Sequence, residues 1–225
     1  MNGTAIIVGV GPGLGLALVK AFSQEGHTVL AAARNAAKLS ELRELERVLP
    51  VDCDTTQATE VEALFERATG IGALRVAVFN AGTYRRGTVV ETDPAEFERS
   101  WRVGAFGGFL VGRAAARHML PAGQGTILFT GATASLRGGA GFVNLASPKF
   151  ALRAVAQSLA RELGPKGIHV AHIIIDGHIR SAGSEGDVDT TLDPQDIAKA
   201  YVELHRQHRS AWTQELDLRP WSEKF

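Results

Sequence analysis

One lysine stands where its charge calls for a partner. The stretch NLASPKFALRAV, residues 144–155, resembles the opening of a helix in which Asn144 or Ser147 can cap and Pro148 fits the first turn. A helix N-terminus already carries partial positive charge, so a cation such as Lys149 is unfavourable there unless it holds something. We therefore predict that Lys149 holds a ligand group.

A glycine cluster near the start of the chain has the composition of a phosphate site. In VGVGPGLG, the four glycines are Gly9, Gly11, Gly13 and Gly15. Glycines let the backbone approach a pyrophosphate, which then binds the N–H groups of a helix N-terminus. The spacing G-x-G-x-x-G fails because Leu14 stands at its last position, whereas G-x-x-x-G-x-G is satisfied. A turn without ligand is the alternative, but the strand–turn–helix context favours a dinucleotide.

The residue pair at the end of the second apolar run selects between two dinucleotides. The sequence there is AAARN, with Ala33 where an acidic residue would bind the ribose 2′-hydroxyl of NAD. Arg34 follows directly, and an arginine accommodates the 2′-phosphate of NADP. We predict NADP(H). NAD remains an alternative, because Arg34 could stack on adenine. A second alternative is that Arg34 is only an exposed charge beside a helix and contacts no cofactor.

These residues need elements to position them, and the hydrophobic pattern supplies strands alternating with helices. Strands are expected at residues 4–9, 28–33, 75–80, 126–131, 169–176 and 212–218. Helical patterns begin near Leu14, Ala36, Gln57, Pro94 and Lys149, and a further helix is expected at 194–208. This alternation predicts a single-domain α/β protein, residues 1–225, with a doubly wound parallel sheet of the Rossmann type.

Composition excludes several classes of function. The chain has 24 basic and 24 acidic side chains and a formal net charge of +0, which gives no indication of a nucleic-acid or membrane partner. Cys53 is its only cysteine, so an intrachain disulfide and a cysteine-based zinc site are both excluded. No apolar run approaches the ~20 residues of a membrane span, and the N-terminus lacks a basic leader. We predict a cytoplasmic protein.

Several motifs in register resemble the short-chain dehydrogenase/reductase family. The glycine spacing, DCDTT from Asp52, FNAG at 79–82 and DGHIRS at 176–181 follow the family's order and distances. Phe79 replaces an asparagine, and Asp176 replaces a proline. The resemblance extends from about Ile6 to Leu218. The cofactor contacts that it implies are at Gly9, Gly13, Leu14, Gly15, Arg34, Asp52, Cys53, Asn80, Ala81, Gly82, Lys149, Ile179 and Ser181.

The catalytic pattern of that family is incomplete in this chain. The resemblance implies a Tyr-x-x-x-Lys motif in which the tyrosine transfers a proton and the lysine binds the nicotinamide ribose. Lys149 matches the lysine, but Leu145 stands at the tyrosine position. Ala132 takes the serine position, with Thr133 as a hydroxyl substitute if the register shifts by one. Gly104 takes the place of the asparagine that supports a proton-relaying water.

Two side chains are candidate substitutes for the missing acid. Tyr84 follows the fourth predicted strand and could reach a substrate, although a tyrosine with its hydroxyl in water is the plainer interpretation. His178 follows the run at 169–176 and titrates near neutral pH, but its side chain is expected to point elsewhere. We read the histidines His118, His169, His172, His205 and His208 as structural, because they lack metal-ligand spacing.

Two functions from different classes therefore remain. The first is an NADP(H)-dependent oxidoreductase of altered chemistry, with Lys149 and, as a weaker candidate, Tyr84 at the reacting centre. The second is a catalytically silent NADP(H)-binding sensor or scaffold. We also predict a homodimer or homotetramer formed by the helices that flank the strand at 126–131, where Gly104, Gly107, Gly108 and Gly112 would allow close approach. The segment 181–191 is predicted to be a mobile lid.

Overall fold

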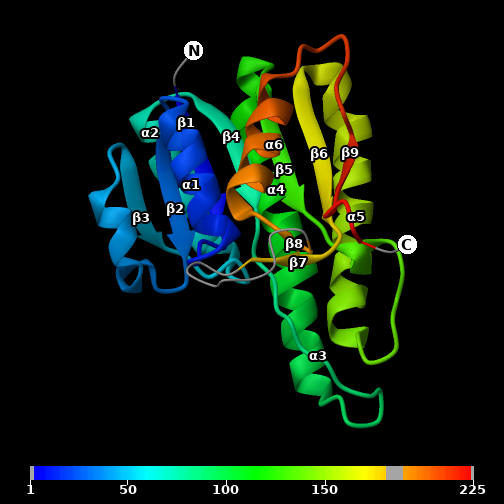
Figure 1. Cartoon of the computed structure of the whole chain (residues 1–225). Helices are drawn as coiled ribbons and strands as arrows, with labels where there is room; N and C mark the ends of the chain where they lie inside the picture. The colour runs from blue at the N-terminus through cyan, green and yellow to red at the C-terminus, as the bar shows by residue number, and fades with distance from the viewer. Residues whose placement is uncertain (1–2, 181–189, 224–225) are drawn as a thin grey trace.

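The apolar runs become one parallel sheet of seven strands. A computed structural model describes residues 3–180 and 190–223. Its strands are β1 (Thr4–Val8), β2 (Thr28–Ala33), β3 (Val48–Asp52), β4 (Leu74–Phe79), β5 (Gly125–Thr130), β6 (Ile168–Ile175) and β9 (Glu215–Leu218). They lie in the order β3-β2-β1-β4-β5-β6-β9, and every neighbouring pair is parallel (Figure 1). The six predicted strands and the Rossmann topology are confirmed.

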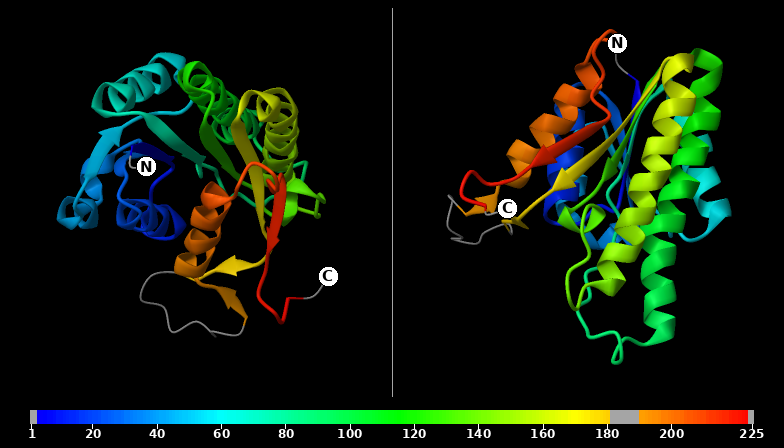
Figure 2. Two further views of the ribbon diagram at one scale, coloured as in Figure 1. Left: turned by 90° about the horizontal axis from the view of Figure 1, so that it is seen from above. Right: turned by 90° about the vertical axis from the view of Figure 1, so that its right-hand side faces the viewer.

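Helices cover both faces of the sheet. Figure 2, seen from above, shows α1 (Leu14–Gln24) and α6 (Pro194–Arg206) on one side. On the other side lie α2 (Ala58–Ile71), α4 (Gly107–Met119) and α5 (Val143–Leu163). Successive side chains of a strand point to opposite faces, so each strand contributes to two cores.

The alternation along β1 illustrates how these cores form. Ile6 and Val8 pack toward α2, α4 and α5, whereas Ala5 and Ile7 pack toward α1 and α6. All four side chains are buried. A strand buried on both faces must be apolar throughout, which is why β1 has a continuous apolar run.

The strand order reverses between β1 and β4. From β1 the chain proceeds to β2 and β3 on one side, and β4 then returns to the other side of β1. In open parallel sheets, ligands bind in the crevice at the carboxyl ends of the strands at such a reversal. The glycine turn after β1 and the NAG segment at 80–82 after β4 both lie there.

The region after β2 differs from the expected pattern. Instead of an α-helix near Ala36, two short 3₁₀ turns, Ala36–Lys38 and Ser40–Glu44, lead into β3. β3 was not among the predicted strands, because Pro50 interrupts its pattern. Proline is tolerated here because β3 is the edge strand of the sheet, where one row of backbone N–H groups has no ladder partner.

Helix α5 begins earlier than the sequence suggested. Its first residue is Val143, and neither Asn144 nor Ser147 caps it. Pro148 therefore lies inside the helix rather than in its first turn, and Lys149 lies beyond the first turn. The helix-terminus argument for Lys149 is wrong, because the terminal partial charge falls off within one turn. The side chain has a different environment, described below.

The glycines expected at a subunit interface are used inside the chain. Helix α3 (Pro94–Trp101) continues through a π-helical turn, Arg102–Phe106, into α4. A Cβ atom on Gly108 would lie 2.3 Å from Leu152 Cδ1, and one on Gly112 would lie 2.7 Å from Leu159 Cδ1. These glycines let α4 pack closely on α5, so the predicted role for them between subunits is wrong.

A short ladder follows the main sheet. β7 (His178–Ile179) pairs with β8 (Thr191–Leu192) in a separate two-stranded sheet. Residues 181–189 of the predicted lid, including Ser181, lie outside the described residues. Among the residues that the structure describes, no helix is both long and apolar enough to span a membrane.

Candidate functional site

The glycine turn has two kinds of glycine. Gly9 has φ +84°, and a Cβ atom there would lie 2.4 Å from the backbone nitrogen of Ala81. A Cβ atom on Gly15 would lie 2.7 Å from Val10 Cα. Both positions exclude other residues for steric reasons. Gly13, the N-cap of α1, has open space beside it, so the N–H groups at the start of that helix remain approachable by an anion.

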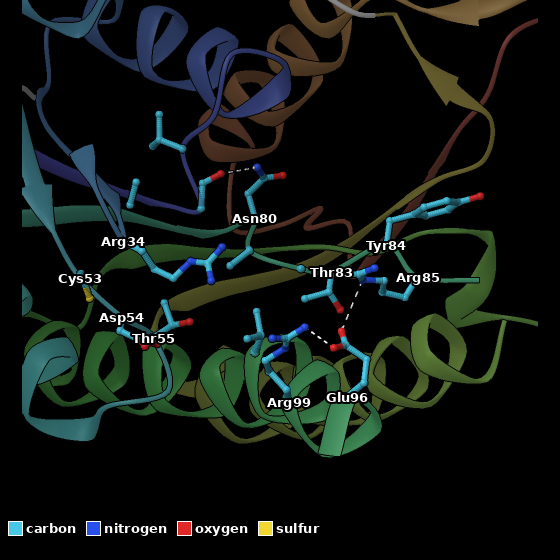
Figure 3. A pocket seen from close by; sticks show the side chains of 16 residues that line it. Arg34, Cys53, Asp54, Thr55, Asn80, Thr83, Tyr84, Arg85, Glu96 and Arg99 are labelled. Atoms are coloured by element: carbon cyan, nitrogen blue, oxygen red, sulfur yellow. Dashed lines mark hydrogen bonds and ion pairs between the residues drawn. The ribbon is translucent and has the colours of Figure 1, made fainter. Parts of the chain in front are cut away.

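A first hollow of about 440 Å³ opens beside this turn. Gly9, Ala33 and Arg34 line it, together with the segments at 53–55 and 80–85. In Figure 3 the guanidinium of Arg34 extends into this hollow, and no carboxylate among the described residues pairs with it. The space and the cation together suit an anionic ligand.

The opposite wall of the first hollow comes from α3. Arg99 is hydrogen-bonded to Glu96, and Arg85 Nε lies 3.5 Å from the same carboxylate (Figure 3). The hydrogen bond from Arg99 holds the pKa of Glu96 below its usual value. None of these residues was among the predicted site residues. Apart from their charge, nothing in the sequence distinguishes Arg85, in the segment after β4, or Glu96 and Arg99, in α3, from other charged residues.

Two predicted contact residues have structural tasks. Asp52 is exposed and does not line the first hollow; its Oδ1 accepts from the backbone N–H of Ala36 at 2.8 Å, which holds the turn after β2. Cys53 and Asp54, the next two residues, line the hollow instead. Asn80 lines it as well, but its side-chain amide donates to Gly9 O at 3.0 Å and so ties β4 to the glycine turn.

Lys149 lies at the centre of the crevice. It is 7% exposed, and its Nζ donates to Thr130 O, at the end of β5, at 2.6 Å. A Cβ atom on Gly82 would lie 3.8 Å from that Nζ. Burial lowers the pKa of Lys149 to about 8. A buried ammonium with donors to spare beside the strand ends is suited to holding ligand oxygens.

A second hollow of about 780 Å³ adjoins Lys149. Leu145 lines it one helical turn before Lys149, and Phe142 and Ile179 add further apolar surface. Tyr84 lines both hollows. An elongated ligand could therefore extend from Arg34 past Lys149, with its reactive end among mostly apolar side chains.

The positions at which the family resemblance expects a serine and an asparagine are also accounted for. Ala132 lines the second hollow, and beside it Thr133 Oγ1 donates to Asp176 Oδ1. At Gly104 a Cβ atom would lie 2.9 Å from Pro148 Cβ. Since Pro148 occupies that space, a side chain at residue 104 would require one of the two helices to shift.

The tyrosines and His178 differ in access to the second hollow. Tyr84 is 68% exposed, its ring meets Phe142 edge-on at 6.2 Å, and in Figure 3 its hydroxyl points away from the other labelled side chains. Tyr201 is fully buried in α6 and shares a hydrogen bond of 2.7 Å with Thr130 Oγ1. It cannot meet a ligand. His178 lines the hollow from the exposed side.

The residues present fit a dinucleotide. The close approach at Gly9 and the open side of Gly13 suit a pyrophosphate, the Arg34 guanidinium suits a 2′-phosphate, and the buried Lys149 suits a ribose. Within the described residues, no group of three or more His, Cys, Asp or Glu side chains could hold a metal ion.

Comparison with known proteins identifies relatives of the whole arrangement. Residues 3–189 match the family model described as short chain dehydrogenase. The 3-phenylpropionate-dihydrodiol/cinnamic acid-dihydrodiol dehydrogenase of Escherichia coli O157:H7 is 31% identical over 211 residues, which cover 88% of this chain and 78% of that protein.

Two solved structures resemble the fold over nearly its entire length. A short-chain dehydrogenase from Rhodopseudomonas palustris is 42% identical, with a TM-score of 0.88 over 98% of this chain and 99% of the other. An alcohol dehydrogenase from Thermococcus sibiricus, complexed with 5-hydroxy-NADP, has a TM-score of 0.89 at 23% identity, covering 100% of this chain and 99% of the other.

Proposed function

The chain belongs to the short-chain dehydrogenase family, and from this membership we propose that it is an NADP(H)-dependent oxidoreductase with a reduced catalytic set. Lys149 is retained, whereas Leu145, Ala132 and Gly104 replace the tyrosine, serine and asparagine. The observation that carries the proposal is the joint lining of the second hollow by Lys149 and Leu145. The expected ligand-binding lysine is present, but the expected proton donor is a hydrocarbon.

The cofactor assignment rests on the first hollow. We propose that the N-terminus of α1 holds the pyrophosphate, that Arg34 binds the 2′-phosphate of NADP, and that Lys149 binds the nicotinamide ribose. Asn80, Ala81 and Gly82 would line the cofactor, and Ile179 would contact its nicotinamide end. Several structural neighbours were solved with NADP or a derivative of it. Once bound, the dinucleotide supplies or accepts a hydride.

The proton then has to be handled by the protein. A positioned general acid contributes about 10²–10⁴-fold in rate, and Leu145 cannot provide one. Tyr84 is the first substitute to consider because it lines the second hollow, although its exposure favours a hydroxyl in water. We therefore propose that ordinary carbonyl reduction is slow, and that the natural substrate is an activated double bond or a group whose proton another residue handles.

NADPH binding and turnover test this proposal separately. Fluorescence titration with NADPH should give saturable binding. Steady-state absorbance should then detect turnover for part of a panel of aldehydes, ketones, enones and aromatic dihydrodiols, the last chosen because a relative acts on 3-phenylpropionate-dihydrodiol. Absence of NADPH binding would refute the cofactor assignment. Tyr84→Phe is the matched variant for the substitute acid, and an unchanged rate would exclude Tyr84.

The same observation favours a second candidate function. A chain that binds NADP(H) beside Leu145 and has no usable acid would sense the cofactor or act as a scaffold. For this candidate, NADPH should bind tightly, and no member of the panel should be converted.

A further inference from the structure

Two residues at positions where this chain departs from the family pattern are hydrogen-bonded to each other. Thr133 stands one residue after the position of the expected serine, and Asp176 replaces a proline 43 residues later. In the folded chain Thr133 Oγ1 donates to Asp176 Oδ1, and both residues line the second hollow beside Lys149. Asp176 is only 8% exposed, and its other oxygen lies 3.5 Å from Arg219 Nη2.

The direction of this hydrogen bond limits what Thr133 can recognise. An ionised carboxylate only accepts hydrogen bonds, so the single hydroxyl proton of Thr133 is committed to Asp176. What the Thr133 oxygen can still offer to a ligand is a lone pair. A lone pair attracts an alcohol O–H and repels a carbonyl oxygen, which has no proton to give.

We propose that Thr133, oriented by Asp176, selects an alcohol over a carbonyl compound as the substrate of the second hollow. This inference rests on the proposed function and extends it by naming the substrate class and the direction of the reaction. Thr133 would touch the substrate oxygen, and Asp176 would act through Thr133 as a positioning residue. The proposed reaction is therefore alcohol oxidation, in which the ionised Thr133–Asp176 pair takes the substrate proton in place of the missing tyrosine.

The same pair can accept the proton that oxidation releases. The O–H bond of the alcohol breaks and its proton passes to Thr133 Oγ1, while the Thr133 proton moves to Asp176 Oδ1. The carbinol C–H bond breaks as a hydride leaves for an oxidised nicotinamide dinucleotide, and the C=O bond forms. The products are a carbonyl compound, the reduced dinucleotide and a protonated Asp176, so all atoms and electrons are accounted for.

Neighbouring charges support this arrangement. Arg219 comes from the segment after β9 and also pairs with Asp217, so it can hold one side of the Asp176 carboxylate. The other ionisable groups that line the hollow are Tyr84, Arg137, Lys149, His178 and Glu223. Among the described residues, none of these groups forms a hydrogen bond or ion pair with the Thr133 hydroxyl, whose partner is Asp176.

Asp176→Asn provides a test that a merely structural role would not satisfy. Arg219 is a donor, so it should attract the amide oxygen of the new asparagine and turn the amide NH₂ toward Thr133. Thr133 would then accept that hydrogen bond, and its own proton would become free for a ligand. The binding preference of Asp176→Asn should therefore shift from the alcohol toward the ketone. Thr133→Val removes both hydrogen bonds, and Thr133→Ser keeps them.

The probes are 1-indanol and 1-indanone, a rigid alcohol and ketone of the same shape. Calorimetry would measure 1-indanol binding to the NADPH complex and 1-indanone binding to the NADP⁺ complex, two combinations in which no hydride can move. One net hydrogen bond is worth roughly 0.5–1.5 kcal/mol, so the alcohol-to-ketone affinity ratio should fall roughly three- to tenfold from wild type to Asp176→Asn. Thr133→Ser should keep the wild-type ratio.

The outcomes separate this inference from the proposed function. If NADPH binds and the ratio is unchanged in Asp176→Asn, or if neither probe binds the wild type, the inference is overturned while the cofactor assignment stands. If NADPH does not bind the folded wild type, both fail. A melting curve for each variant controls for loss of folding, and Thr133→Val provides a second route to the same comparison.

Discussion

The two hollows of the crevice differ in how closely their residues match those expected from the family pattern. The hollow beside the glycine turn has the steric glycines, an arginine with no ion pair among the described residues, and the access to a helix N-terminus that a dinucleotide needs. The hollow beside Leu145 has a hydrocarbon where an acid is expected, an alanine where a hydroxyl is expected, and a threonine–carboxylate pair in their vicinity.

Under the proposed function, this difference would separate binding from chemistry within one fold. The first hollow depends on backbone geometry, which the sheet imposes and few substitutions can alter. The second depends on a few side-chain atoms, and exchanging them leaves the packing of the sheet unaffected. A chain can therefore keep a cofactor site while its reaction changes or disappears.

The largest expected effect comes from restoring the missing side chains. Leu145→Tyr with Ala132→Ser should raise reduction of benzaldehyde by NADPH by about 10²–10⁴-fold, because a positioned acid contributes that much. Residue 145 lies within α5, one turn before Lys149, and a nearby ammonium favours the phenolate. The measurement is the decrease in NADPH absorbance.

Leu145→Phe with Ala132→Ser is the matched control, since it adds a ring of similar size without the hydroxyl. If the tyrosine variant binds NADPH as the wild type does and gains no activity, the second hollow has been rebuilt for other purposes. That result would favour the silent cofactor-binding protein.

The next effect concerns the stability cost of keeping Lys149. Its pKa is about 8 in the folded chain and near 10.5 when exposed, so burial penalises the charged form. The penalty is complete below pH 8 and disappears as pH rises toward 10.5. Unfolding in denaturant should show the wild type gaining about 3 kcal/mol over that window relative to Lys149→Met.

Measurements from pH 7, below that window, to pH 9.5, within it, are sufficient for the comparison. A constant difference between the two proteins across it would mean that Lys149 is not desolvated in solution. The affinity for NADPH should also be lower in Lys149→Met than in the wild type. Lys149 would then be a residue that is kept for cofactor binding at the expense of folding stability.

A smaller effect is expected at Arg34. Arg34→Ala should weaken NADPH binding roughly 10- to 100-fold and leave NADH nearly unchanged, because hydrogen bonds to charged groups contribute about 1.5–3 kcal/mol. In the wild type the preference for NADPH should shrink as salt rises. Fluorescence titrations with NADPH and NADH measure both the affinity loss and the salt dependence. Arg43→Ala removes a charge outside the hollow and serves as control; equal affinities in the wild type would contradict the assignment.

The smallest effect on either hollow should come from the outer face of α4 and α5. Phe109 and Phe150 are 44% and 43% exposed, and we propose that they lie in a homo-oligomer interface. Light scattering should give at least twice the chain mass of 23.9 kDa, and a lower mass for Phe109→Glu with Phe150→Glu. NADPH affinity should be unchanged. A wild-type monomer at micromolar concentration would refute the interface.

The sequence by itself determined the fold and the backbone features of the proposed cofactor end of the site. Buried parallel strands must be apolar throughout, and the turn at Gly9 must be glycine, so both leave signals in consecutive residues. The sequence also predicts Lys149 as a site residue, and the structure buries it beside the second hollow, although the helix-terminus argument for it is wrong. The predicted start of α5 was wrong because Pro148 suggests a first turn, whereas the helix begins at Val143 and the Pro148 ring packs against Gly104.

Only the tertiary structure decided which distant residues meet. Thr133 and Asp176 are 43 residues apart, and their hydrogen bond exists because β5 and β6 are neighbours in register. The glycines of α4 could be assigned to the interior only once Leu152 and Leu159 were placed against them. Local patterns record the backbone conformation that each residue must adopt, whereas side-chain contacts depend on strand order and helix packing, which no short stretch of sequence contains.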